Sequence, residues 1–209
     1  MPIVFRNALF VIGFLLIFGR AEAVTLNFQS LETSGNSFTA VGTTYSEAGY
    51  TIGVSSGSLG VFETENIDYA GSTAMFQTFV NSLASLTNDG GNEFNALSIR
   101  LSELSSTFLF GGPISFTGNL AAGGTVTQAF SIDGVFGFEL FSFSSSFSHL
   151  VSLSWVQGLA STSNPYFQFD DITIETLSAI PLPAALPLFG TALAGMGLLG
   201  WLRRRKAAA

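Results

Sequence analysis

The residues best suited to chemistry are two adjacent acids, Asp170 and Asp171, near the end of the long folded segment. They lie in the run YFQFDDITIET, where the apolar residues Phe167 and Phe169 occupy one alternation phase and Ile172 and Ile174 the other. Such a slip predicts a β-bulge. Adjacent carboxylates at a bulge can aim two side chains at one calcium ion, which prefers six to eight oxygen ligands. The alternative is that one Asp caps the bulge and the other faces water.

A second chemistry is suggested by tyrosines that could stack on sugar rings. We expect Trp155 and Tyr50 to be buried, because both lie on the apolar phase of predicted strands. Tyr45, Tyr69 and Tyr166 fall in predicted loops and are the candidate glycan contacts. Each is equally compatible with an ordinary half-buried loop aromatic.

Catalysis is disfavoured. His149, the single histidine, lies on an apolar phase and is expected to be a packed strand residue, and no G-x-S-x-G elbow accompanies it. No phosphate loop, nucleotide fingerprint or Cys/His cluster occurs. Glu63, Glu65, Asp68 and Glu103 could supply a carboxylate pair for glycoside hydrolysis, so a secreted polysaccharide hydrolase remains the alternative.

The segment that must position these residues is acidic and has no cysteine. Between Val24 and Ser178 there is one basic residue, Arg100, against thirteen acidic ones, a net charge of −12. Nucleic acid is therefore excluded as a partner, since it requires clustered Lys and Arg. Without disulfides, stability must come from burial, and the seventeen Phe of this segment can supply it.

The alternation of the segment predicts short strands. Apolar residues recur at every second position in many stretches, and Gly-rich turns separate these stretches about every ten residues. This is typical of an all-β fold, an antiparallel β-sandwich of the jelly-roll kind. Residues 73–86 fit either a helix or two short strands. A further phase slip near Leu140 predicts a bulge or a change of sheet.

Both ends of the chain carry targeting patterns. Arg6, an apolar run and Ala21-Glu22-Ala23 form a secretory signal peptide over residues 1–23, with cleavage expected after Ala23. At the other end, residues 184–202 contain no charge, and as a helix they would span about 28 Å, one membrane crossing. The basic residues that follow, which are Arg203, Arg204, Arg205 and Lys206, predict a cytoplasmic end and an external body.

The C-terminal segment, residues 179–209, resembles the PEP-CTERM class of bacterial sorting signals in its VPLPA variant. The resemblance rests on a short motif, an apolar Gly- and Leu-rich helix and an Arg cluster, in that order. The motif residues are Ile180 in place of the usual Val, Pro181, Leu182, Pro183 and Ala184. The resemblance implies recognition by an exosortase, a membrane-embedded transpeptidase-like enzyme of Gram-negative bacteria that make exopolysaccharide. A plain single-pass anchor is the alternative.

The body has a resemblance of its own. The runs GGTVTQAFSIDG, FSHLVSLSW and YFQFDDITI are similar to the back half of jelly-roll sandwiches that precede such tails, which are similar to galactose-binding-like carbohydrate-binding modules. The resemblance implies that Asp170 and Asp171 help to hold a structural calcium ion. It leaves the remaining ligands open, and Glu32 or Glu47 from the N-terminal strands are the candidates. We therefore expect a 24–178 sandwich, delivered to the cell surface or extracellular matrix, with a non-catalytic role in the polysaccharide layer.

Overall fold

The computed structural model describes residues 22–159, 161, 163, 165–177, 189, 192, 193 and 196. Residues Ala21–Ser178 form one compact unit. Beyond it, the described residues Phe189, Ala192, Leu193 and Met196 are helical and exposed. No helix among the residues described is long and apolar enough to cross a membrane.

The targeting patterns fall almost wholly outside the described residues. This holds for the signal peptide except its last two residues, for the sorting motif Ile180–Ala184 and for the basic cluster Arg203–Lys206. Ala23, the expected cleavage residue, lies within the first strand. The signal peptide, the membrane span and the sorting signal stay predictions.

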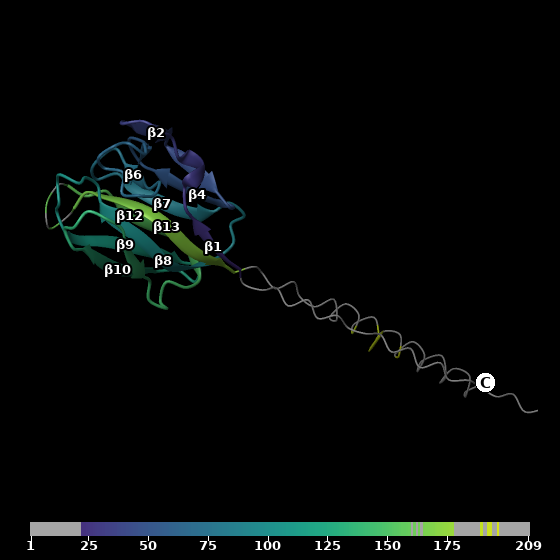
Figure 1. The fold of residues 1–209 in the computed structure, drawn as a ribbon. Helices are drawn as coiled ribbons and strands as arrows, with labels where there is room; N and C mark the ends of the chain where they lie inside the picture. The colour runs from purple at the N-terminus through teal and green to yellow at the C-terminus, as the bar shows by residue number, and fades with distance from the viewer. Residues whose placement is uncertain are drawn as a thin grey trace, which may run out of the picture. The chain divides into compact units, whose positions relative to one another are not determined.

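The compact unit is built of strands and one short 3-10 helix (Figure 1). The elements are β1 (Glu22–Leu26), η1 (Gln29–Leu31), β2 (Phe38–Gly42), β3 (Thr44–Glu47), β4 (Tyr50–Val54), β5 (Leu59–Phe62), β6 (Met75–Gln77), β7 (Leu83–Asn88), β8 (Phe94–Glu103), β9 (Gly112–Leu120), β10 (Thr125–Ile132), β11 (Glu139–Ser142), β12 (Leu150–Val156) and β13 (Phe167–Thr176).

The strands form two layers of antiparallel sheet. The first sheet runs β2-β5-β6-β13-β8-β11, with β1 also paired to β13. The second runs β3-β4-β7-β12-β9-β10. Between the two sheets, the recorded strand pairing is the single pair Leu150 and Phe94 of β12 and β8. The predicted all-β, antiparallel sandwich architecture is therefore confirmed.

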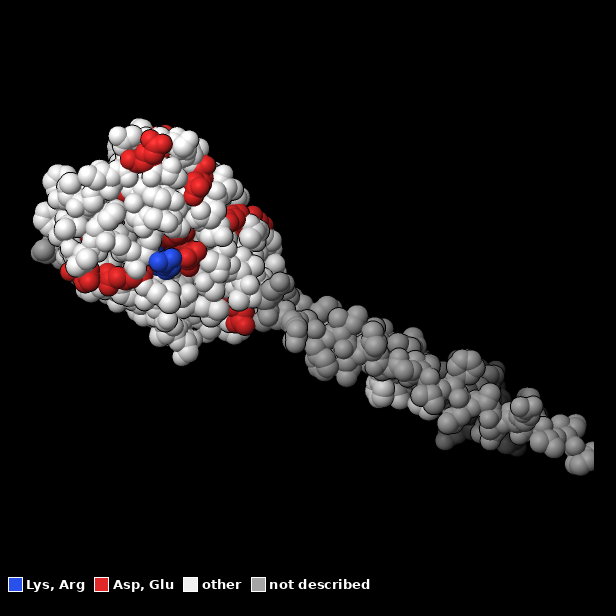
Figure 2. All heavy atoms as spheres, viewed as in Figure 1, with Lys and Arg blue, Asp and Glu red and all other residues white. Residues whose placement is uncertain are grey.

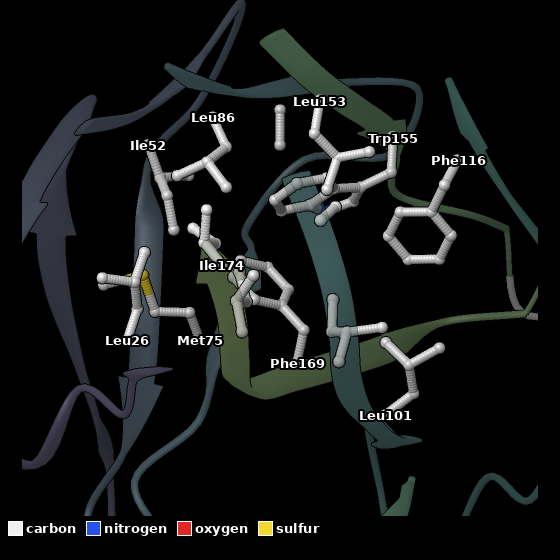
Figure 3. Packing of buried hydrophobic residues seen from close by; sticks show 14 of the residues in the cluster. Leu26, Ile52, Met75, Leu86, Leu101, Phe116, Leu153, Trp155, Phe169 and Ile174 are labelled. Carbon is white, nitrogen blue, oxygen red and sulfur yellow. The ribbon is translucent and has the colours of Figure 1, made fainter. Parts of the chain in front are cut away.

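The core lies between the sheets and is rich in aromatic residues (Figure 3). Trp155 of β12 packs against Phe169 of β13, with ring centroids 4.9 Å apart, and against Phe116 of β9 at 5.6 Å. Tyr50 and Trp155 are both about 1 % exposed, as predicted from their phase. Burial of each large apolar side chain stabilises the fold by about 1.5 to 3 kcal/mol, and this replaces the missing disulfides.

The ambiguous segment 73–86 adopts strands, not a helix. Met75–Gln77 forms β6, and β7 begins at Leu83. Between them, Phe79 and Val80 are exposed in a loop. Cross-strand pairing of Met75 with Phe169 and of Leu86 with Leu153 outweighs the local helical spacing.

Of the two predicted phase slips, the one at Asp170 marks irregular strand pairing, whereas β11 pairs regularly with β8 around Leu140. The pairing of β13 with β8 shifts register between Asp170 and Thr173, and Asp171 has φ of +46°. This confirms the bulge. In the other region, Leu140 is exposed while Phe141 and Phe143 turn inward.

A bulge between Leu150 and Ser152 turns Val151 outward, and its side chain is exposed. The prediction for the neighbouring His149 was wrong, because His149 is not packed in a strand. It precedes β12 with φ of +55°, and its exposed ring lies 2.8 Å from the Glu93 carboxylate.

Candidate functional site

The outer side of the second sheet carries a regular array of hydroxyl groups, which we name the hydroxyl face. Alternation along each strand sends one phase into the core and the other outward. The register places Ser85 of β7 opposite Ser154 of β12, and Ser154 opposite Thr117 of β9. Thr117 is in turn opposite Thr127 of β10. The rows of hydroxyls therefore cross the sheet at the strand spacing of about 4.8 Å.

This face is hollowed into a groove with two parts. The first part is lined by Thr43, Thr44, Thr51, Gly53, Val54, Ser55, Leu83, Ser85 and Thr87. The second is lined by Leu83, Pro113, Ser115, Thr117, Ser154, Trp155, Val156 and Ser163. Leu83 belongs to both, so the hollows adjoin. No ionisable side chain occurs among these lining residues.

The groove has hydrogen-bonding capacity but no stacking platform. Trp155 contributes to its floor, yet its ring is buried against Phe116 and Phe169. Ser154 donates a hydrogen bond to the Thr117 carbonyl at 3.2 Å and keeps its acceptor capacity. This face was not predicted from the sequence. The pattern that indicates it is the recurrence of Ser and Thr at every second position of three strands, in the pairs Ser85 and Thr87, Ser115 and Thr117, and Ser152 and Ser154.

The three predicted glycan contacts lie elsewhere and do not come together in the groove. Tyr45 is in strand β3, not in a loop; its ring packs on Phe28, and its hydroxyl lies 2.8 Å from that of Ser30. Tyr69 is half-buried in a loop and donates a hydrogen bond to Glu32 at 3.2 Å. Tyr166 is half-buried just before β13. Their role in glycan binding stays a prediction.

Asp170 and Asp171 differ in their surroundings. Asp170 is fully buried; its Oδ1 accepts the Asp171 N–H at 2.7 Å, and its Oδ2 has no hydrogen-bond partner among the described residues. Asp171 is half-buried and lies 3.3 Å from the Arg100 guanidinium. The bulge thus turns the Asp170 carboxylate inward and the Asp171 carboxylate toward the Arg100 guanidinium. On the face shown in Figure 2, one basic patch is visible, and acidic side chains lie beside it.

Burial is also the main influence on the protonation of Asp170. It raises the pKa of that carboxyl to about 6, and the negative charge of Asp171 adds to the rise. The Ser72 hydroxyl, the Asp171 backbone N–H and Arg100 oppose it. A buried carboxylate with one unpartnered oxygen is costly to ionise, and a bound cation would relieve that cost.

Glu32 and Glu47, the further ligands considered for calcium, both accept hydrogen bonds from other groups. Glu32 accepts hydrogen bonds from Tyr69 at 3.2 Å and from Thr73 at 3.4 Å. Burial raises the pKa of Tyr69, and the charges of Glu32 and Asp170 add to the rise, while the Thr73 hydroxyl opposes it. Glu47, the other predicted ligand, instead accepts the Phe28 N–H at 3.2 Å. Calcium at Asp170 and Asp171 stays a prediction.

Two of the carboxylates considered for glycoside hydrolysis accept hydrogen bonds from nearby loop residues. Glu63 accepts the Ser37 N–H at 2.9 Å. Asp68 accepts the Ser106 N–H at 2.8 Å and the Ser105 hydroxyl at 3.0 Å. Glu103 is buried in a separate acidic group with Asp133 and Glu139.

Comparisons with known proteins return structural neighbours alone. No protein-family model matches the chain, and no curated protein matches it. The structure is similar to a variant of a family 29 carbohydrate-binding module, with 12 % identity over 67 % of this chain and 90 % of that one and a TM-score of 0.36.

A second neighbour is the family 32 carbohydrate-binding module of C. perfringens NanJ, solved with galactose. It shows 12 % identity over 65 % of this chain and 98 % of that one, with a TM-score of 0.37. A third is a family 11 module from Clostridium thermocellum, solved with a β-1,3-1,4-mixed-linked tetrasaccharide, at 11 % identity over 71 % of this chain and 100 % of that one and a TM-score of 0.28.

Proposed function

We propose that this is an exported, non-catalytic protein whose body binds a neutral polysaccharide along the hydroxyl face. The observation that carries the proposal is the groove across β4, β7, β12 and β9, whose described lining combines Ser and Thr with apolar residues and contains no ionisable side chain. Each hydroxyl can donate one hydrogen bond and accept others, as sugar hydroxyls do. A neutral glycan chain matches such a surface without leaving a buried charge unpaired.

The expected affinity is low for a single site. A hydrogen bond exchanged with water contributes about 1 kcal/mol net, so four of them correspond to a dissociation constant near 1 mM. The groove offers no aromatic platform that would add stacking energy. A polymer that presents many equivalent segments, and not a free monosaccharide, is therefore the ligand class that fits.

The delivery route is part of the same proposal and is supported by the sequence. The signal peptide carries the chain out, and the helix over residues 184–202 holds it in the membrane with the body outside until an exosortase-type enzyme acts near Ile180–Ala184. The body then belongs to the cell surface or the extracellular matrix. Its net charge of −12 suits a partner that is neither nucleic acid nor anionic lipid.

Binding is tested by co-sedimentation of the full chain, kept in solution with a mild detergent, with insoluble neutral polysaccharides. The Ser85→Ala/Thr117→Val variant removes one hydroxyl from each part of the groove and should bind at least tenfold more weakly. Ser145→Ala removes an exposed hydroxyl outside the groove and serves as the matched control. Equal binding by all three proteins would refute the hydroxyl face as the glycan site.

The same samples separate binding from hydrolysis. A non-catalytic protein leaves the amount of soluble reducing sugar unchanged over prolonged incubation. Release of sugar that the Ser85→Ala/Thr117→Val variant fails to produce would favour the hydrolase alternative.

Processing is tested by intact-mass spectrometry of the protein recovered from its own host. The proposal expects a C-terminus near the Ile180–Ala184 motif. A C-terminus at Ala209 would instead support the plain membrane anchor.

A further inference from the structure

A second acidic group lies away from Asp170 and from the hydroxyl face. It consists of Glu103 at the end of β8, Asp133 just after β10 and Glu139 at the start of β11. Each contributes one carboxylate oxygen to a cluster in which all these atoms lie within 4.8 Å of one another. The antiparallel pair Glu139 and Leu101 brings β11 alongside β8, and the loop 133–138 returns Asp133 to the same place.

The three carboxylates share one hydrogen-bonding pattern. Glu103 Oε1 accepts the Gly134 N–H at 2.8 Å, Asp133 Oδ1 accepts the Val135 N–H at 2.7 Å and Glu139 Oε1 accepts the Asp133 N–H at 3.1 Å. One oxygen of each acid therefore holds the loop. The second oxygen accepts no hydrogen bond from the residues the structure describes.

Glu103 makes this arrangement more than a surface cluster. Its side chain is 0 % exposed, and its Oε2 atom is buried without a partner. Asp133 is exposed and Glu139 half-buried, so the group runs from the interior to the solvent. A buried carboxylate that has one unpartnered oxygen and lies beside two further carboxylates requires either a proton or a cation.

Among the described residues, the side chains that can carry a positive charge are engaged elsewhere. Arg100 is the single basic residue between Val24 and Ser178, and its guanidinium is engaged by Asp171 and lies 5.0 Å from the centre of the Phe138 ring. His149 pairs with Glu93. Burial raises the pKa of Glu103, and the charges of Asp133 and Glu139 add to the rise, while the backbone N–H groups of Glu103 and Gly134 oppose it.

We propose that Glu103, Asp133 and Glu139 bind a calcium ion. Oxygens that lie within 4.8 Å of one another can all be reached by one Ca²⁺ at about 2.4 Å, so the three carboxylates can share one ion. The flexible shell of Ca²⁺, which takes six to eight oxygen ligands including water, suits this set better than the strict octahedron that Mg²⁺ demands, and the set offers neither His nor Cys for zinc. Water at the exposed side completes the coordination. The ion fastens the β10–β11 loop to the end of β8.

The test is a calorimetric calcium titration of the full chain in detergent after removal of metal with a chelator. Asp133→Asn/Glu139→Gln keeps the carbonyl oxygens that hold the loop and removes two charges near the surface, so it preserves folding better than a change at Glu103. It should lose one equivalent of bound calcium, or bind it at least tenfold more weakly. Magnesium should bind the unaltered chain at least tenfold more weakly than calcium.

Two control variants identify the site. Asp170→Asn changes the other candidate site and should retain this equivalent of calcium. Glu65→Gln removes an exposed charge elsewhere and should behave as the unaltered chain. Absence of binding at millimolar calcium, or binding that Asp170→Asn abolishes and Asp133→Asn/Glu139→Gln leaves intact, would overturn the proposal.

Discussion

The two sheets of the sandwich share one core but carry opposite kinds of polar chemistry. The described lining of the groove on the outer side of the second sheet consists of hydroxyl-bearing and apolar residues and includes no ionisable side chain. The first sheet instead contains the two fully buried acids, Asp170 of β13 and Glu103 of β8. The hydroxyl rows lie where register is regular, whereas the acids lie at a bulge and at a strand end. Regular pairing thus produces a neutral surface, and breaks in pairing produce sites for charge.

The largest expected effect comes from the residue that joins the two sheets. Trp155→Ala should lower the free energy of unfolding by about 3 to 5 kcal/mol, because the ring fills the space between Phe116 and Phe169. Denaturant unfolding measures this, and Trp155→Phe provides a milder variant that should still fold. Val156→Ala, on the exposed phase beside it, should change stability by about 0.5 kcal/mol or less. Similar values for Trp155→Ala and Val156→Ala would contradict the shared core.

Removal of the buried charge of Asp170 should stabilise the fold, whereas Trp155→Ala destabilises it. In calcium-free buffer at pH 7.5, Asp170→Asn should raise the free energy of unfolding by about 1 to 3 kcal/mol, since a pKa of about 6 in the fold against 3.8 in the unfolded chain makes ionisation unfavourable. The amide keeps the oxygen that accepts the Asp171 N–H.

The pH dependence checks the cause of this gain. Because the folded state binds the Asp170 proton more tightly, the carboxylate destabilises the fold above pH 6, and the penalty disappears as the pH falls through 6 toward 3.8. The difference between Asp170→Asn and the unaltered chain should therefore shrink over that window. A constant difference from pH 4 to pH 7.5 would assign the gain to packing. If calcium binds at Asp170, then with calcium present at pH 7.5 the Asp170→Asn variant should be less stable than the unaltered chain.

The ion pair on the first sheet should matter much less. Arg100 and Asp171 are each about a third exposed at 3.3 Å, so solvent screens their attraction. Arg100→Gln should lower the free energy of unfolding by about 0.5 to 1 kcal/mol, including the contact of the guanidinium with Phe138. The loss should be smaller in 1 M salt. An effect above about 2 kcal/mol would place this pair in a less solvated setting than its exposure indicates.

The smallest stability effect is expected on the hydroxyl face. Ser85→Ala/Thr117→Val should change the free energy of unfolding by about 0.5 kcal/mol or less while it weakens glycan binding, because its hydroxyls contribute little to packing. Thermal unfolding beside the co-sedimentation assay separates these two effects. A large loss of stability would mean that the hydroxyls hold the sheet together and that the binding result is indirect.

The sequence predicted the sandwich, the buried Trp155 and the bulge at Asp170, because each depends on alternation within one strand. It left residues 73–86 open between a helix and two short strands, because the choice depends on pairing with distant strands. It also gave no sign of the outward turn of Val151, which depends on the bulge in β12. The groove and the group of Glu103, Asp133 and Glu139 were missed for a similar reason. Their members come from different strands, and register between strands is not visible in a single sequence.

The pairing of β1 with β13 bears on when the fold can be completed. The first strand, Glu22–Leu26, lies beside the last, with Val24 opposite Ile174. The chain therefore cannot close its sandwich until nearly the whole body has been synthesised, and contacts of such long sequence separation form slowly. For the proposed export, in which the chain would cross a membrane in extended form, this late closure lengthens the interval in which the chain is still competent to cross.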